Sequence, residues 1–114
     1  MPAMKDLLNK KFTVGSWITL GDPSVAEIMA QAGFDWLTVD MEHSALTLYR
    51  VQQLVQIIEL AGCIPLVRVG ENNANLIKRV MDTGAHGVII PMVNSKEEAE
   101  LALSAVKYPP FGSR

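Results

Sequence analysis

The chain has 114 residues, of which 49% are hydrophobic and 19% charged, and its formal net charge at pH 7 is −2. The length suits one domain, and the composition is typical of folded proteins and excludes the disordered class. Acidic and basic residues are interspersed, so no basic patch indicates a nucleic-acid partner. No apolar run reaches the roughly 20 residues of a membrane span, and the first residues lack the apolar core of a signal peptide. Cys63, the only cysteine, is expected to be a small buried residue, and we expect a cytoplasmic protein.

Short apolar runs alternate with stretches of helical periodicity along the chain. We predict strands at residues 13–18, 36–40, 65–69 and 87–91, and helices at 23–32, 48–61, from 72 or 73 to 83, and from 95 to 106. Asp22, Thr47 and Ser95 are the expected N-caps, while Asn72 and Asn73 are alternatives for the third helix.

Two finer expectations concern the first and last of these helices. The first should bury a face formed by Val25, Ile28, Met29 and Ala32, because these apolar residues recur at helical spacing. In the last, the spacing from Ser95 to Glu98 is that of a capping box, in which the glutamate reaches back to the amide of the cap residue.

The alternation of strand and helix predicts a parallel sheet. Strands such as residues 87–91 are almost unbroken apolar runs, as parallel strands buried on both faces are. Four such βα units could form a small doubly wound open sheet or half of an eight-stranded barrel. A dinucleotide-binding open sheet should have a Gly-x-Gly-x-x-Gly turn after its first strand, but this turn has one glycine, Gly21. Since a whole barrel has about 250 residues, we predict an α/β fold comprising the first four βα units of a (β/α)8 TIM barrel, with residues 1–114 forming the amino-terminal half of one domain.

Side chains that could carry chemistry follow the predicted strands, at the edge where parallel βα folds hold their functional groups. They are Trp17 after the first strand, Asp40, Glu42 and His43 after the second, Arg68 at the end of the third, and Pro91, Met92 and Asn94 after the fourth. His43 is a candidate for proton transfer, and Asp40, three residues earlier, could orient the ring and stabilise the imidazolium. The alternative is a surface loop that happens to carry charge.

Arg68 lies in an otherwise apolar strand. Strand alternation puts Leu66 and Arg68 on one face and Val67 and Val69 on the other. A buried charge needs a partner. Arg68 is therefore either a ligand for a carboxylate or enolate oxygen, or one half of an internal salt bridge.

Two further polar residues lie at the opposite edge of the predicted sheet. His86 precedes the fourth strand, where a packing or solvated histidine is favoured. Asp82, near the end of the third helix, could act only on a neighbouring subunit. No lysine falls within a predicted strand, so the chain offers no candidate for Schiff-base chemistry.

Taken together, these motifs resemble the HpcH/HpaI aldolase family. The resemblance spans essentially the whole chain in Gly15-Ser16-Trp17, Ala32-Gly33-Phe34-Asp35-Trp36, Asp40-Met41-Glu42-His43, Pro65-Leu66-Val67-Arg68-Val69, and residues 82–93 and 108–114. It implies a TIM barrel and a class II, metal-dependent aldolase that cleaves a 4-hydroxy-2-oxo acid or a 2-keto-3-deoxy sugar acid to pyruvate and an aldehyde.

The resemblance also implies roles for individual residues. His43 would serve acid/base chemistry with Asp40 supporting it, Arg68 would bind the keto oxygen of pyruvate and stabilise the enolate, and Trp17 would contribute to substrate binding. Asp82 matches an acid at a subunit boundary, and homo-oligomers, commonly hexamers, are implied. The implied cofactor is a divalent metal, Mg²⁺ or Mn²⁺, whose glutamate and aspartate ligands are expected beyond residue 114, so no metal ligand is assigned within the chain.

Two other interpretations stay open at this point. The chain could be a non-catalytic half-barrel, because four strands leave two open edges and an uncovered inner face. It could also be a citrate-lyase-like or malyl-CoA-like lyase of the same superfamily. Trp17 and the Pro-Pro-x-Gly-x-Arg segment at 109–114 favour the aldolase branch by resemblance.

Overall fold

A computed structural model describes residues 2–114. Its elements are α1 (Met4–Leu8), β1 (Gly15–Ile18), α2 (Pro23–Ala30), β2 (Trp36–Asp40), α3 (Leu48–Leu60), β3 (Ile64–Arg68), α4 (Ala74–Met81), β4 (Gly87–Ile89) and α5 (Lys96–Val106). The strands form one sheet in the order β1-β2-β3-β4, and each neighbouring pair is parallel.

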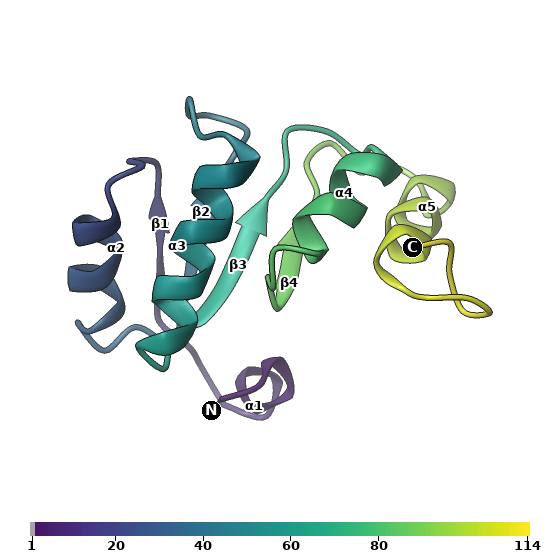
Figure 1. Ribbon diagram of the computed structural model, residues 1–114. Coiled ribbons are helices and arrows are strands. Elements are labelled where there is room, and N and C mark those ends of the chain that lie inside the picture. Colours follow the sequence, from purple (N-terminus) through teal and green to yellow (C-terminus); the bar gives the residue numbers. More distant parts are fainter. Residues whose placement is uncertain (1) are drawn as a thin grey trace.

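The sheet order decides between the two predicted architectures. A doubly wound sheet reverses its strand order at a switch point, whereas here each strand lies beside the one that precedes it in the chain. Right-handed crossovers then bring successive helices to the same face of the sheet. Figure 1 shows α2, α3, α4 and α5 following one another in the order of the strands. The predicted α/β fold of four parallel βα units is confirmed.

The core lies between the sheet and its helices. Leu37 and Val39 of β2, Val67 of β3, and Val69 directly after β3 are fully buried on the helix-facing side of the sheet. They share one apolar cluster with Val51, Leu54, Val55 and Ile58 of α3. Val67 and Val69 therefore lie on the opposite side of the sheet from Arg68, as the alternation predicts.

The bounds of the predicted helices and strands lie within two residues of those observed. Helix α1 was not predicted, and β4 ends at Ile89 rather than residue 91. The buried face of α2 is predicted correctly only in part. Met29 packs against the core as expected, but Ala26 and Ala30 are the buried residues and Ile28 is 70% exposed. Helix α2 packs against α3, and small alanine side chains allow the two helices to approach closely.

Side-chain caps fix where the helices begin. The side chains of Asp22, Thr47 and Ser95 accept the amides of residues 24, 50 and 98, as predicted. Asn73 rather than Asn72 caps α4, since its Oδ1 accepts the amide of Leu76 at 2.9 Å. The predicted capping box is displaced by one residue, because the Glu98 carboxylate accepts the amide of Asn94 and not that of Ser95.

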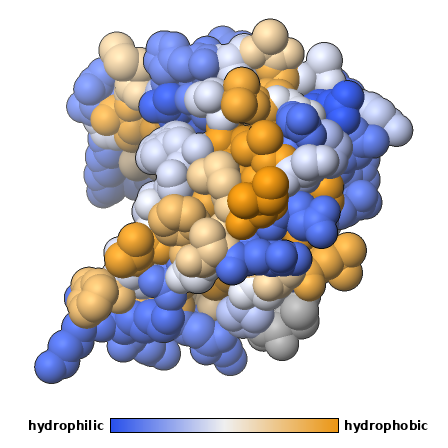
Figure 2. Space-filling view, turned by 90° about the vertical axis from the view of Figure 1, so that its left-hand side faces the viewer, coloured by the Kyte–Doolittle hydropathy of each residue, from blue (hydrophilic) through white to orange (hydrophobic). Residues whose placement is uncertain are grey.

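The two outer strands, β1 and β4, each have a neighbour on one side only among the described residues. Figure 2 looks at the β1 and α2 side and shows hydrophobic residues in a band flanked by hydrophilic ones. Exposed apolar side chains in and around these elements are Val14, Trp17, Leu20 and Ile28. Each helix in residues 2–114 is too short or too polar to span a lipid bilayer.

Candidate functional site

The sheet register brings two predicted site residues face to face. Asp40 ends β2 and lies opposite Arg68, which ends β3. Arg68 Nε donates to Asp40 Oδ1 at 3.0 Å, and Arg68 Nη2 donates to Asp40 Oδ2 at 2.6 Å. This two-pronged geometry is the strongest that an arginine and a carboxylate form. The internal salt bridge foreseen for Arg68 is therefore present, and Asp40 is its partner.

Asp40 also organises the loop that follows β2. Its Oδ1 accepts the backbone amides of Glu42 at 2.9 Å and His43 at 3.2 Å, and its own carbonyl accepts the hydroxyl of Ser44. The residue is only 2% exposed. The Arg68 guanidinium holds the pKa of the Asp40 carboxyl below its ordinary value, and the two amides lower it further, against the opposing effect of burial. Asp40 is therefore a fixed anion that anchors its strand end.

Arg68 is held on a second side by an aromatic ring. Its guanidinium carbon lies 4.5 Å from the ring centroid of Trp17, at the end of β1. This is the distance of a cation–π contact. The bond to Asp40 raises the pKa of Arg68 above its ordinary value, so the group stays charged. A guanidinium carries five N–H groups. Since Asp40 accepts only from Nε and Nη2, N–H groups on both terminal nitrogens remain for other oxygens.

His43 lies beside this cluster, and its ring contacts Glu42. His43 Nε2 is 3.2 Å from Glu42 Oε1, and the same carboxylate oxygen is 3.6 Å from Arg68 Nη1. The His43 side chain is 72% exposed, whereas those of Arg68 and Glu42 are mostly buried. Asp40 reaches His43 only through the backbone amide. The carboxylate beside the imidazole is thus that of Glu42, not Asp40 as the sequence spacing suggested.

The arrangement can do two kinds of chemistry at one edge of the sheet. Arg68 offers N–H donors to an oxygen that develops negative charge, and His43 is accessible to give or take a proton. The two carboxylates of the site are poorly placed to bind a metal ion without further ligands. Both oxygens of Asp40 accept hydrogen bonds, and one oxygen of Glu42 faces Arg68 and His43. Within residues 2–114, no three His, Cys, Asp or Glu side chains gather as a metal site. The present side chains do not fit a complete divalent-metal site.

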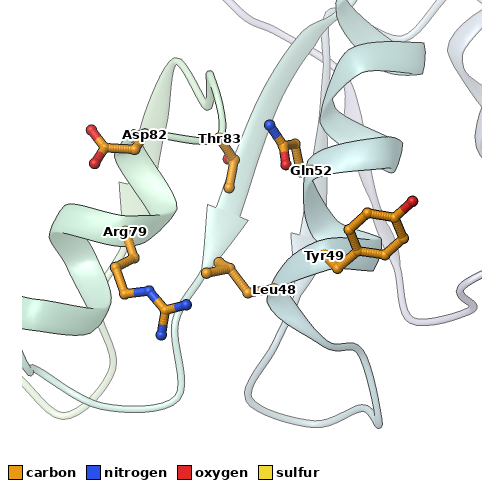
Figure 3. Close-up of a pocket in the computed structure, with 6 residues that line it drawn as sticks. All are labelled: Leu48, Tyr49, Gln52, Arg79, Asp82 and Thr83. Atoms are coloured by element: carbon orange, nitrogen blue, oxygen red, sulfur yellow. The ribbon is translucent and has the colours of Figure 1, made fainter.

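Asp82 lies elsewhere, at the C-cap of α4. Its carboxylate accepts from Arg114 Nη2 at 2.8 Å, and the Arg114 guanidinium stacks on Tyr108. Asp82 also lines an outer cleft of about 370 Å³ between α3 and α4, together with Leu48, Tyr49, Gln52, Arg79 and Thr83. Figure 3 shows these side chains projecting from the two helices. Asp82 therefore lies in the helical layer, away from the site formed by Asp40, Glu42, His43 and Arg68.

The remaining predicted residues take structural positions. His86 Nε2 lies 2.8 Å from Glu59 Oε1, which agrees with the packing role favoured for it. Cys63 is buried, as predicted, and burial raises the pKa of its thiol. After β4, Met92 is exposed with φ 57°, and Asn94 donates to its carbonyl.

The sequence did not predict two contacts of the site. The Glu42 carboxylate lies between His43 and Arg68, and the Arg68 guanidinium stacks on the Trp17 ring. The sequence indicated only that Glu42 follows the second strand, between Asp40 and His43. The contact between Trp17 and Arg68 could have been inferred from the strand order. The two residues lie near the carboxyl ends of β1 and β3, which both pair with β2.

Comparison with known proteins gives a consistent result. A model of the HpcH/HpaI aldolase/citrate lyase family matches residues 13–114. The chain is 44% identical over 101 residues to 2-dehydro-3,6-dideoxy-6-sulfogluconate aldolase of Pseudomonas putida, covering 89% of this chain and 40% of that protein. It is 38% identical to 2-keto-3-deoxy-L-rhamnonate aldolase of Klebsiella pneumoniae, covering 99% of this chain and 42% of that protein.

Solved structures match over the same stretch. The crystal structure of an HpcH/HpaI aldolase from Desulfitobacterium hafniense superimposes with a TM-score of 0.89 at 34% identity, over 100% of this chain and 45% of that one. The chain thus spans less than half the length of the relatives it matches.

Proposed function

Because the chain belongs to the HpcH/HpaI aldolase/citrate lyase family, we propose that it provides the pyruvate-binding half of an aldolase that cleaves a 4-hydroxy-2-oxo acid or 2-keto-3-deoxy sugar acid. One observation carries the proposal. Asp40 binds Arg68 at the carboxyl edge of the sheet, and among residues 2–114 no other hydrogen bond uses the N–H groups of the guanidinium. The Glu42 carboxylate lies between Arg68 and His43, 3.6 Å from Arg68 Nη1 and 3.2 Å from His43 Nε2.

In this proposal Arg68 binds the keto oxygen of the substrate. Aldol cleavage breaks the C3–C4 bond, and its electron pair becomes the enolate of pyruvate. The negative charge that grows on the keto oxygen is then stabilised by a donor that is already fixed, so little reorganisation is needed. Asp40 and Trp17 hold the guanidinium from two sides, which limits its freedom before substrate arrives.

His43 moves the proton in the proposed reaction. Cleavage requires a base to remove the proton of the 4-hydroxyl group, and an exposed imidazole at the mouth of the site can accept it. The divalent cation implied by the family resemblance belongs to the proposal as a cofactor that chelates the 2-oxo acid when bound. The side chains of residues 2–114 do not form its site. Asp82 as a subunit-boundary acid, and a homo-oligomer, are proposed on the resemblance alone.

A chimera tests the function directly. Residues 1–114 would replace the matching first part of the K. pneumoniae aldolase, and pyruvate release from 2-keto-3-deoxy-L-rhamnonate would be measured with Mg²⁺ or Mn²⁺. We expect turnover in the chimera and its loss in Arg68→Ala, while Glu59→Gln, a control far from the site, keeps it. A folded chimera that releases no pyruvate contradicts the proposal.

The isolated 114-residue chain decides the second candidate, a non-catalytic half-barrel. The observation that favours it is the lack of a complete metal site among the described residues. Pyruvate release by the isolated chain, under the same conditions, would rule that candidate out. A chimera that cleaved a citryl or malyl thioester but no 2-keto-3-deoxy acid would instead favour the citrate-lyase branch named in the family description.

A further inference from the structure

We infer that Glu42 is a positioning residue, whose carboxylate holds the His43 imidazole beside the Arg68 guanidinium. The inference rests on the proposed function, since it assigns the contact that keeps the proton-transfer group next to the oxygen-binding group. A single oxygen makes both contacts, with Glu42 Oε1 lying 3.2 Å from His43 Nε2 and 3.6 Å from Arg68 Nη1.

The His43 ring depends on Glu42 for its orientation. The backbone amide of His43 is fixed by Asp40, but the side chain is 72% exposed. Among the described residues, Glu42 provides the polar side-chain contact of the ring. An exposed side chain without a partner samples several rotamers on a fast timescale. Removal of the Glu42 carboxylate should therefore release the ring while leaving the backbone in place.

Arg68 does not need Glu42 for charge neutralisation. Asp40 already balances the guanidinium through two hydrogen bonds, so Glu42 adds a carboxylate in excess. The three side chains Asp40, Glu42 and Arg68 together carry a formal charge of about −1 with each group ionised. Glu42 is therefore available to orient the ring, because Arg68 does not require it for charge balance.

The loop backbone makes this placement rigid. The amide of Glu42 donates to Asp40 Oδ1 at 2.9 Å, so the residue that carries the bridging carboxylate is tied to the anchor of the site. The Glu42 side chain is 20% exposed, compared with 72% for His43. The more buried group of the pair is thus the one that can act as the fixed support.

The first test uses the 114-residue chain and needs no catalytic activity. We would measure NMR order parameters of the His43 ring in wild type, Glu42→Ala and Glu42→Gln. We expect Glu42→Ala to lower the ring order parameter to below about 0.6, the range of flexible groups, with an intermediate value for Glu42→Gln. The Arg68 Nε–H signal should persist in both variants, because Asp40 still binds that group, and this signal reports that the fold is intact.

A matched control lies at the other edge of the sheet. Glu59 Oε1 lies 2.8 Å from His86 Nε2, within hydrogen-bond distance. Glu59→Ala should therefore free the His86 ring and leave His43 unchanged. An unchanged His43 order parameter in both Glu42 variants would overturn the inference. So would an equal loss of order at His43 in Glu59→Ala, because the effect would then be global.

The second test measures catalysis in the chimera described above. We expect Glu42→Ala to lower kcat for pyruvate release about 10²-fold, the cost of misplacing a catalytic group. KM should change little because Asp40 still holds Arg68. A fall confined to KM would contradict positioning of His43. If the wild-type chimera is inactive, the proposed function fails, and the NMR measurement alone decides the role of Glu42.

Discussion

Replacing Asp40 with asparagine should destabilise the chain strongly for a single-atom change. The Asp40 carboxylate accepts four N–H groups, two from the backbone and two from Arg68. An asparagine has one acceptor oxygen, so its amide group must face an N–H donor on at least one side. Removal of one partner of a buried ion pair costs about 3–5 kcal/mol.

Partial exposure of Arg68 reduces this figure. The Arg68 side chain is 25% exposed, so water can solvate part of the charge that Asp40→Asn leaves behind. We therefore expect the free energy of unfolding to fall by about 2–3 kcal/mol, the range found for a lost bond to a charged group. In a chain of this size that corresponds to a fall in Tm of about 10 °C.

Urea unfolding followed by circular dichroism at pH 7 measures the effect. The matched control is Glu100→Gln, in which the carboxylate also pairs with a cation, Lys96, but both side chains are largely exposed, at 64% and 83%. Exposed pairs contribute less than about 1 kcal/mol, so the control should lie close to wild type. The reasoning is refuted if Asp40→Asn unfolds with the wild-type free energy, or if both variants lose the same amount.

The same pair makes a prediction about pH. The pKa of Asp40 in the folded chain lies below its ordinary value of 3.8. A lowered folded pKa contributes stability that is fully present above the unfolded value and is lost as the pH falls through the folded value. Wild type should therefore lose stability more steeply than Asp40→Asn below about pH 4. Parallel curves for the two proteins would show that Asp40 does not carry this dependence.

Three further predictions concern the core, the thiol and the first strand. Leu54 is fully buried, so Leu54→Ala should lower the free energy of unfolding by about 2–5 kcal/mol. Leu60 is 82% exposed, so Leu60→Ala should change the free energy of unfolding by less than about 0.5 kcal/mol. Urea unfolding of the two variants checks this contrast. Cys63 should react with a thiol reagent only as fast as the chain unfolds, because it is buried and its pKa is raised, and rapid reaction in native buffer would refute this. Gly15→Ala should lower Tm, because an added Cβ would lie 2.0 Å from the Trp36 ring, and a Tm equal to that of wild type would mean that the ring moves aside freely.

Much of the fold could be predicted because the signals were local. The caps at Asp22, Thr47 and Ser95 and the apolar runs of the strands are fixed by residues within a few positions of one another. The face of α2 could not be predicted from its periodicity, because small alanines rather than the larger Ile28 form the contact with the rest of the core. That choice depends on how closely a neighbouring helix approaches.

The candidate site shows the same division. The strand ends placed Asp40, His43 and Arg68 at one edge, since parallel strands end together. Which carboxylate meets which cation depended on the register of β2 against β3 and on the path of the loop that follows. These long-range features place the Asp40 carboxylate against Arg68 and the Glu42 carboxylate against His43.

Proton exchange at the methyl group of pyruvate tests the central claim most directly. Enolisation at the Arg68 site should exchange these protons with D₂O in the chimera supplied with Mg²⁺ or Mn²⁺, without any aldehyde present. We expect exchange in the wild-type sequence and its abolition in Arg68→Ala. Exchange that continues unchanged in Arg68→Ala would contradict the account.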